Sequence, residues 1–209
     1  MSRGTWERIK PPEYYSATDF ERAQWACGVP PRYWDSKLSS INPASAVYSF
    51  KGKRERIAPT VQNQYLKDRV ENPEILKSNR FACLSSSPTD EHAMAAACAL
   101  VNAYVAKAWE ADLPLKVRVD DVQDYEECLK VGKVFYSVTP DILVLYNLDD
   151  NSSKERLSLV KDVIKRFEGI YRAVVATSDS PLGFARNKLY CEPQEVYYFE
   201  GLPRKVVSR

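Results

Sequence analysis

A short apolar run at residues 141–146 constrains the fold of this chain more than any other feature of its sequence. The run reads Asp-Ile-Leu-Val-Leu-Tyr and shows no alternation of apolar and polar residues. A strand has this composition when helices cover both faces of its sheet. Residues 173–177, Ala-Val-Val-Ala-Thr, have the same character. Further strands are expected at residues 80–84, 115–119 and 195–199.

Helical patterns separate the expected strands. Helices are predicted from Thr89 to about Glu110, where alanine, leucine and valine recur at helical spacing, and over residues 120–130 and 154–168. Strands that alternate with helices imply right-handed crossovers and a mainly parallel sheet. The expected fold class is therefore α/β, a three-layer domain in which helices flank the sheet.

The region before this core is rich in aromatic residues and proline. Residues 1–50 are expected to form an N-terminal extension with one short helix, because Thr18 and Glu21 have the spacing of a capping box and Gly28 marks a helix end. Residues 51–79 are expected to be a basic connecting segment, residues 80–202 the α/β core and residues 203–209 a basic tail.

The composition of the chain argues against several classes of function. The formal net charge of the 209 residues is +2, so the protein as a whole is not a general binder of polyanions. Five cysteines lie far apart without a CxxC pair, and there is one histidine, so no metal site is expected. No stretch approaches the length of a membrane span and the N-terminus lacks an apolar signal core, so a cytoplasmic protein is expected.

Several segments, taken in order, resemble the AAA+ core of bacterial replicative-helicase loaders of the DnaC type. Residues 26–34, Ala-Cys-Gly-Val-Pro-Pro-Arg-Tyr-Trp, look like the segment that precedes the ATPase domain in that family. Residues 81–105 are similar to a P-loop strand, loop and helix, residues 141–148 occupy the place of the Walker B strand, and residues 174–182 resemble the sensor-1 strand. The resemblance implies a P-loop NTPase-like AAA+ core. Little sequence follows the last expected strand, so this core is expected to be without the family's helical lid.

The residues at the place of the P-loop depart from that family's pattern. A P-loop uses glycine amides to wrap the phosphates, a lysine to reach the β- and γ-phosphates and a Ser or Thr to bind magnesium. The resemblance places Ser86, Thr89 and Glu91 at the glycines, His92 at the lysine and Ala93 at the hydroxyl. Asp90 and Glu91 also put negative charge at a helix N-terminus, where a triphosphate would otherwise bind best.

The place of the Walker B acids is also changed. The resemblance puts Tyr146 and Asn147 there, and neither is a strong magnesium ligand. Asp149 and Asp150 follow, but they are expected to lie beyond the end of the strand. The sequence therefore predicts a protein that is not an enzyme and that holds no nucleotide or other cofactor.

Two functions of different classes fit this pattern. The first is a non-catalytic pseudo-ATPase that acts as a protein-interaction scaffold or adaptor in DNA replication or in a phage or mobile-element process. Its expected partner is a replicative helicase, another part of the replication machinery or an active AAA+ paralogue. Trp25, Tyr33 and Trp34 are candidate partner-binding residues, and the alternative is that they pack the extension onto the core.

The second function is a stand-alone nucleic-acid-binding module. Between residues 51 and 69 there are six Lys or Arg and two acids, and Tyr48, Phe50 and Tyr65 are available to stack on bases. An ordinary exposed loop has a similar composition, so both interpretations stay open. The candidate phosphate contacts are Lys51, Lys53, Arg54, Arg56, Lys67 and Arg69.

Acidic residues at 120–127 also suggest a magnesium-dependent nuclease site. The preferred interpretation is a helix start enriched in acids on a solvated face, because no strand-borne motif of acids and lysine accompanies them. His92 is expected to be an exposed residue of a first helical turn. The acids in question are Asp120, Asp121, Asp124, Glu126 and Glu127.

Overall fold

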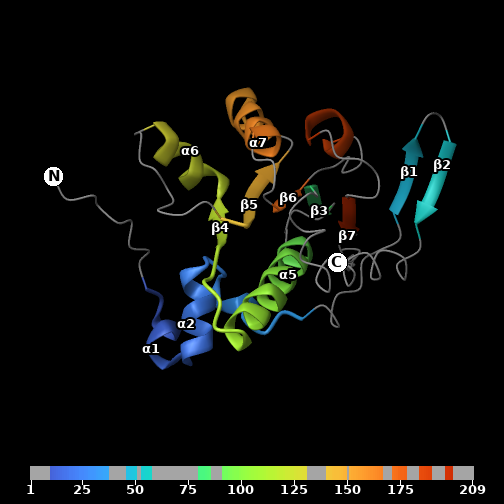
Figure 1. Cartoon of the computed structure of the whole chain (residues 1–209). Helices are drawn as coiled ribbons and strands as arrows, with labels where there is room; N and C mark the ends of the chain where they lie inside the picture. The colour runs from blue at the N-terminus through green and yellow to red at the C-terminus, as the bar shows by residue number, and fades with distance from the viewer. Residues whose placement is uncertain are drawn as a thin grey trace, which may run out of the picture.

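The structure is a computed structural model, and its ribbon is shown in Figure 1. It describes residues 10–37, 46–50, 53–57, 80–85, 91–130, 140–149, 151–166, 171–177, 184–189 and 196–199. Among these described residues, the elements that precede the sheet are two α-helices, one 3-10 helix and a two-stranded hairpin. These are α1 (Pro12–Ser16), α2 (Asp19–Ala26), η1 (Pro31–Tyr33), β1 (Ala46–Phe50) and β2 (Lys53–Ile57).

A five-stranded parallel sheet forms the centre of the domain. Its order is β4-β5-β6-β3-β7, and each pair of neighbouring strands is parallel. The expectation of a mainly parallel sheet is confirmed, and all five expected strands are present. Their bounds are β3 (Arg80–Ser85), β4 (Val117–Asp121), β5 (Ile142–Asp149), β6 (Tyr171–Thr177) and β7 (Val196–Phe199).

Helices cover both faces of this sheet. The connection from β3 to β4 runs in one direction across the sheet, while the connections from β4 to β5, β6 and β7 return in the other. Because crossovers between parallel strands are right-handed, the two directions put their helices on opposite faces. Figure 1 shows α5 and α2 on one side and α6 and α7 on the other. The helices are α5 (Glu91–Glu110), α6 (Val122–Lys130), α7 (Lys154–Arg166) and the short η3 (Ala185–Leu189).

The alanine-rich helix α5 packs against the centre of the sheet. Ala93, Ala96 and Ala97 are fully buried, and their small side chains let the helix backbone approach the strands closely. The same core cluster contains Val119 of β4 and Val144 of β5. Residues from the N-terminal extension belong to it as well, so the extension and the sheet share one hydrophobic core. These residues are Cys27, Val29 and Tyr33.

The start of α2 is the capping box that the sequence predicts. The Thr18 hydroxyl accepts from the backbone N–H of Glu21 at 3.2 Å, and the Glu21 carboxylate accepts from the backbone N–H of Thr18 at 2.6 Å. The Thr18 backbone N–H and the Thr18 hydroxyl, which donates at 2.7 Å, hold the pKa of the Glu21 carboxylate below its usual value. The box therefore satisfies two of the amides at this end of the helix.

The end of α2 also agrees with the sequence. Gly28 has a φ of 95°, a conformation that suits glycine, and it follows the C-cap residue Cys27. The N–H of Val29 donates to the Gln24 carbonyl at 3.1 Å and the N–H of Gly28 donates to the Trp25 carbonyl at 2.8 Å. This pair of bonds is a Schellman motif, and it turns the chain toward the sheet.

Strand and helix boundaries differ from the sequence prediction around β4 and α6. Residues 120 and 121 were expected to start a helix, but β4 extends to Asp121 and α6 begins at Val122. In the parallel ladder Asp120 pairs with Leu145 and Asp121 with Tyr146. The low strand propensity of aspartate is overridden here because the neighbouring strand supplies backbone partners.

Strand β5 is longer than the sequence prediction and irregular. It continues to Asp149, which pairs with Thr177 of β6, and its register shifts between Leu145 and Leu148. The expectation that Asp149 lies beyond the strand end is therefore wrong. A β-bulge adds residues to one strand of a ladder, and it carries the strand past the point where the apolar pattern ends.

The hairpin β1–β2 was not predicted from the sequence. Ala46 pairs with Ile57 and Phe50 with Lys53 in an antiparallel register. The five residues of β1, Ala-Val-Tyr-Ser-Phe, show no clear alternation that would distinguish a strand from the aromatic extension around it. The hairpin contacts β7 through β1, so the basic segment begins beside one edge of the sheet.

Candidate functional site

The carboxyl ends of β3 and β6 form the point of this sheet where a ligand site is expected. The chain leaves β3 toward β4 and leaves β6 toward β7, and these two connections run in opposite directions. Open α/β sheets bind ligands at such a switch point, outside the carboxyl ends of the strands. Ser85 ends β3 and pairs with Thr177, which ends β6, and α5 begins six residues later at Glu91. A helix therefore begins close to the carboxyl end of β3, at the switch point of the sheet.

The residues predicted at the phosphate position are only partly described. Ser86 and Thr89 lie outside the described residues, as does Asp90. Glu91 and His92 are the first two residues of α5. Ala93 has 0% of its surface exposed and packs into the core cluster. This position of the first turn therefore presents a methyl group to the core.

The end of β5 is shaped by the bulge at Tyr146 and Asn147. Asn147 has a φ of 62°, in the left-handed region that asparagine tolerates better than most residues. Its side-chain amide donates to the Asp121 carboxylate of β4, whose other oxygen accepts from the backbone N–H of Gln123 at 2.7 Å. Because β4 and β6 flank β5 on opposite sides, this hydrogen bond directs the Asn147 side chain away from the switch point. Tyr146 is half-buried and packs against the core cluster.

Asp149 is a carboxylate that the sequence prediction placed outside the strand. Its Oδ1 accepts from the backbone N–H of Asn151 at 2.9 Å and from the hydroxyl of Ser152 at 3.2 Å. The N–H of Ser152 donates to the Asp149 carbonyl at 3.1 Å. The side chain thus closes a tight turn that leads into α7, which is a common role for aspartate.

Two buried amide side chains fix the N-terminal extension to the core. Gln24 and Asn102, called the amide clamp below, are 1% and 7% exposed. The Gln24 amide donates to Asn102 Oδ1 at 2.8 Å and to the Trp34 carbonyl at 3.0 Å. Asn102 Nδ2 donates to the carbonyls of Tyr33 at 2.9 Å, Trp34 at 3.2 Å and Ser36 at 3.1 Å. The clamp therefore supplies hydrogen-bond donors to backbone carbonyls of a segment that is not part of a β-sheet.

The same extension also covers an edge of the sheet. The N–H of Val119 in the edge strand β4 donates to the Cys27 carbonyl at 2.8 Å. The Trp34 indole N–H donates to the Val29 carbonyl at 3.0 Å. Edge strands leave such groups open to other chains, and here the extension occupies one of them.

The predicted partner-binding residues take part in this packing to different degrees. Tyr33 is buried at 6% exposure, while Trp25 and Trp34 are half-buried. The alternative that they pack the extension onto the core describes Tyr33 and Trp34 well. Contact of a partner with these residues stays a prediction.

The basic residues of the predicted nucleic-acid site are also only partly described. Alternate residues of a strand lie on opposite faces, and residues that pair across a ladder share a face. Arg54 pairs with Ser49 and Arg56 with Val47, whereas Lys53 pairs with Phe50. The two arginines therefore fall on one face of the hairpin and Lys53 on the other. Lys51, Lys67, Arg69 and Tyr65 lie outside the described residues.

The prediction of a solvated acidic face at 120–127 is wrong for Asp120. This residue is 3% exposed, and its carboxylate accepts from Nη2 of Arg118 at 3.2 Å. Burial, and then the charge of Asp120, raises the pKa of the nearby Tyr125 hydroxyl. The sequence carried no pattern that would distinguish this aspartate from its neighbour Asp121, because a buried charge depends on where the partner strand and helix lie.

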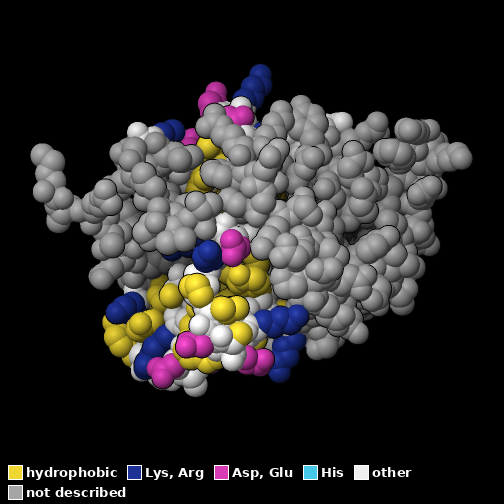
Figure 2. All heavy atoms as spheres, viewed as in Figure 1, with side chains coloured by type: hydrophobic (Ala, Val, Ile, Leu, Met, Phe, Trp, Pro, Cys, Tyr) yellow, Lys and Arg dark blue, Asp and Glu magenta, His cyan; other side chains and the backbone are white. Residues whose placement is uncertain are grey.

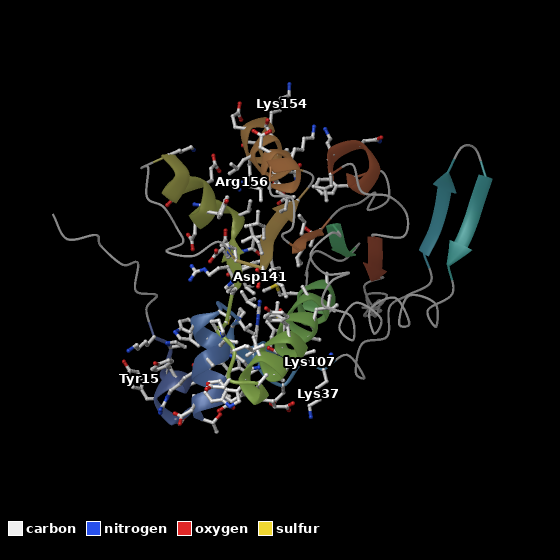
Figure 3. All side chains as sticks on the ribbon, in the orientation of Figure 1. Tyr15, Lys37, Lys107, Asp141, Lys154 and Arg156 are labelled. Carbon is white, nitrogen blue, oxygen red and sulfur yellow. The ribbon has the colours of Figure 1, made fainter. Side chains whose placement is uncertain are left out.

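The acids on α6 have mixed positions. Asp124 and Glu127 are exposed, as expected. Glu126 pairs with Lys130 at 2.7 Å and with Arg156 of α7 at 3.1 Å, and these hydrogen bonds hold its pKa below the usual value. Figure 3 shows Arg156 on the side of α7 that faces α6. The pair therefore ties the two helices on this face of the sheet together.

In the part of the chain that the structure describes, no three His, Cys, Asp or Glu side chains gather into a potential metal site. None of the described helices is both long and apolar enough to cross a membrane.

This chain is similar to known proteins in structure but matches none of the compared families or curated proteins in sequence. No protein-family model matches the chain, and no curated protein matches it in sequence. A crystal structure of the DnaC helicase loader matches at a TM-score of 0.50 and 16% identity, over 82% of this chain and 99% of that one. A crystal structure of DnaI matches at a TM-score of 0.48 and 15% identity, over 84% of this chain and 93% of that one. The strand order and the helix that follows β3 agree with the first of these matches. The chain therefore has a P-loop NTPase-like fold, similar to that of the DnaC helicase loader.

Proposed function

We propose that this chain is a helicase-loader-like pseudo-ATPase, a non-catalytic scaffold or adaptor that binds protein partners in DNA replication or in a phage or mobile-element process. The observation that carries the proposal is the contrast between a P-loop NTPase-like framework and the residues at its switch point. The framework positions a helix N-terminus after β3. The residues at that place are unsuited to phosphate and magnesium.

The start of α5 supports this proposal. Glu91 is its first residue, so the sequence puts an acidic residue at the end of the helix where a phosphate would bind. Ala93, at the position of the expected magnesium-binding hydroxyl, is buried and has no oxygen to offer. A triphosphate at this turn would meet negative charge without a compensating lysine.

The end of β5 supports it in a second way. Magnesium at a phosphate site is usually held by carboxylates and phosphate oxygens. Here the side chain of Asn147 is tied to Asp121 on the outer strand, and the carboxylate of Asp149 accepts two hydrogen bonds within its own turn. Neither arrangement provides a carboxylate that is oriented by the strand toward a metal ion at the switch point.

The nucleotide prediction is tested by thermal unfolding with and without 1 mM ATP and magnesium. A site with a Kd of about 10 μM would stabilise the protein by roughly 2.7 kcal/mol and raise Tm by about 5–10 °C. We expect a Tm change below about 1 °C and no ATP turnover above that of buffer. Turnover that disappears in a His92→Ala variant would contradict the proposal directly.

The prediction of a protein partner is tested with the same purified protein. The full chain is mixed with the purified replicative helicase of its own host, and complex formation is followed by light scattering during gel filtration. A complex that forms without nucleotide, and is not strengthened by ATP, is the expected result. If neither the helicase nor the other purified replication proteins of that host bind at micromolar concentration, the scaffold role is wrong.

A nucleic-acid-binding module remains the second candidate, since the hairpin register places Arg54 and Arg56 on one face. This function predicts single-strand binding that weakens steeply with salt, as phosphate contacts release counterions. An Arg54→Ala/Arg56→Ala variant would then lose most of its affinity, while Lys130→Ala on α6 would not. Equal binding by both variants excludes the hairpin as the contact.

A further inference from the structure

An exposed apolar patch lies where α2 meets the C-terminal end of α5. Trp109 is 48% exposed and Leu113 is 60% exposed, among the largest apolar exposures in the described part of the chain. The Trp109 ring packs edge to face on the half-buried ring of Phe20, with centroids 6.0 Å apart. Figure 2 shows hydrophobic side chains gathered on this lower lobe, with charged side chains around them. These three residues are called the Trp109 patch below.

The backbone at the end of α5 holds the patch in place. The N–H of Leu113 donates to the Ala108 carbonyl at 2.8 Å and the N–H of Asp112 donates to the Trp109 carbonyl at 3.2 Å. This is a second Schellman motif, and the position that takes a positive φ is Asp112, at 50°, where α2 uses Gly28. A non-glycine residue there costs some stability. It also places a carboxylate beside Trp109 and Leu113.

The two charged residues between Trp109 and Leu113 along the chain are both acidic. Glu110 and Asp112 are exposed next to the Trp109 patch, and the C-terminal carbonyls of α5 add the negative end of the helix dipole. Lys107 lies two residues before Trp109 and so falls on the opposite side of the helix. On the side of α1 and α2, Lys10 lies over the Tyr14 ring at 4.9 Å, and Arg22 lies over the same ring at 5.8 Å and pairs with Asp19 at 3.2 Å.

The Trp109 patch, as far as the described residues define it, is smaller than the interface of a stable homodimer. At their exposed fractions, Trp109 and Leu113 together present roughly 200–250 Å² of surface. Each partner in a standard protein–protein interface contributes about 800 Å². An area of this size suits a few anchoring side chains of a short segment, which is how helix-in-groove recognition works. A tryptophan face beside two carboxylates also attracts a cation.

We propose that the Trp109 patch is a docking site for a short basic amphipathic helix of a protein partner. One or two apolar side chains of that helix contact Trp109 and Leu113, and its Lys or Arg side chains lie beside Glu110 and Asp112. The proposal rests on the scaffold function above and names one contact surface for it.

The test uses the full chain and two labelled 16-residue amphipathic helical peptides. Both carry the same apolar face of Leu and Phe, and one has Lys and Arg on its polar face where the other has Glu. Fluorescence anisotropy is expected to give at least a tenfold lower Kd for the basic peptide. Trp109→Ser should weaken its binding at least tenfold, and Glu110→Lys/Asp112→Lys should remove the preference for the basic peptide.

The matched control is Tyr15→Ser, which removes another exposed aromatic ring, 73% exposed on α1 and pointing outward at the far side of α2 in Figure 3. It should leave both affinities unchanged, and the Tm of every variant is measured to show that it folds. Equal binding of the two peptides, or an intact affinity in Trp109→Ser, overturns the proposal. So does a dimer that Trp109→Ser abolishes. If the helicase complex forms and Trp109→Ser does not weaken it, the docking site is wrong while the scaffold function stands.

Discussion

Asn102→Ala is expected to lower the free energy of unfolding by about 3–4 kcal/mol, the larger of the two main effects predicted for this chain. The side chain donates to the carbonyls of Tyr33, Trp34 and Ser36 and accepts from Gln24 at 2.8 Å. Alanine removes all of these bonds at once. A buried polar group without a partner costs roughly 1–3 kcal/mol, and the variant leaves several.

The measurement is urea unfolding followed by far-ultraviolet circular dichroism. Asn187→Ala is the matched control, because Asn187 is an exposed asparagine in η3, and it should change the unfolding free energy by less than about 0.5 kcal/mol. Gln24→Ala completes a double-mutant cycle. Since Gln24 and Asn102 share a hydrogen bond, the two changes should be non-additive by at least about 0.5 kcal/mol. Additive effects would mean that the amide clamp does not act as a unit.

The Asn102→Ala substitution should also loosen the attachment of the N-terminal extension to the core. Without the clamp, the segment from Tyr33 to Ser36 loses its fixed backbone partners, and amide hydrogen exchange in that segment should speed up at least tenfold relative to β5. Exchange that stays as slow as in the native protein would show that the core contacts of Val29 and Tyr33 alone hold the extension in place.

Asp120→Asn is expected to lower the free energy of unfolding by about 2–4 kcal/mol, the second large effect. Asp120 is 3% exposed while Arg118 is 28% exposed, with 3.2 Å between Nη2 and Oδ1. The substitution keeps the volume of the side chain but removes the negative charge that lies 3.2 Å from the partly buried arginine. Removing one member of such a pair costs more than the pair itself contributes.

The check is again urea unfolding, with Asp124→Asn on the exposed side of α6 as the control. That control should stay within about 0.5 kcal/mol of the native protein. An Arg118→Met/Asp120→Leu double variant should recover much of the loss, because apolar residues of similar volume often replace a buried pair without cost. A double variant as unstable as Asp120→Asn would show that packing around β4, and not the lost charge of Asp120, sets the effect.

Local patterns in the sequence predicted much of this fold because neighbouring residues settle them. The apolar run at 141–146 needs cover on both faces, so it predicts a central parallel strand whatever lies around it. Thr18, Glu21 and Gly28 act through hydrogen bonds and dihedral angles within one or two turns, and α2 begins and ends as they predict. The helical spacing in α5 likewise needs no partner to be recognised.

Only the tertiary structure decided which polar residues are buried and where the strands end. Asp120 and Asp121 are adjacent aspartates, yet Asp120 is buried and pairs with Arg118, while Asp121 accepts a hydrogen bond from Asn147 at the carboxyl end of β4. Gln24 and Asn102 are 78 residues apart, and no local pattern links them. The physical reason is the same in each case. A backbone hydrogen bond or a cap forms within a short stretch of chain, whereas burial and long-range pairing depend on the free energy of the whole packed core.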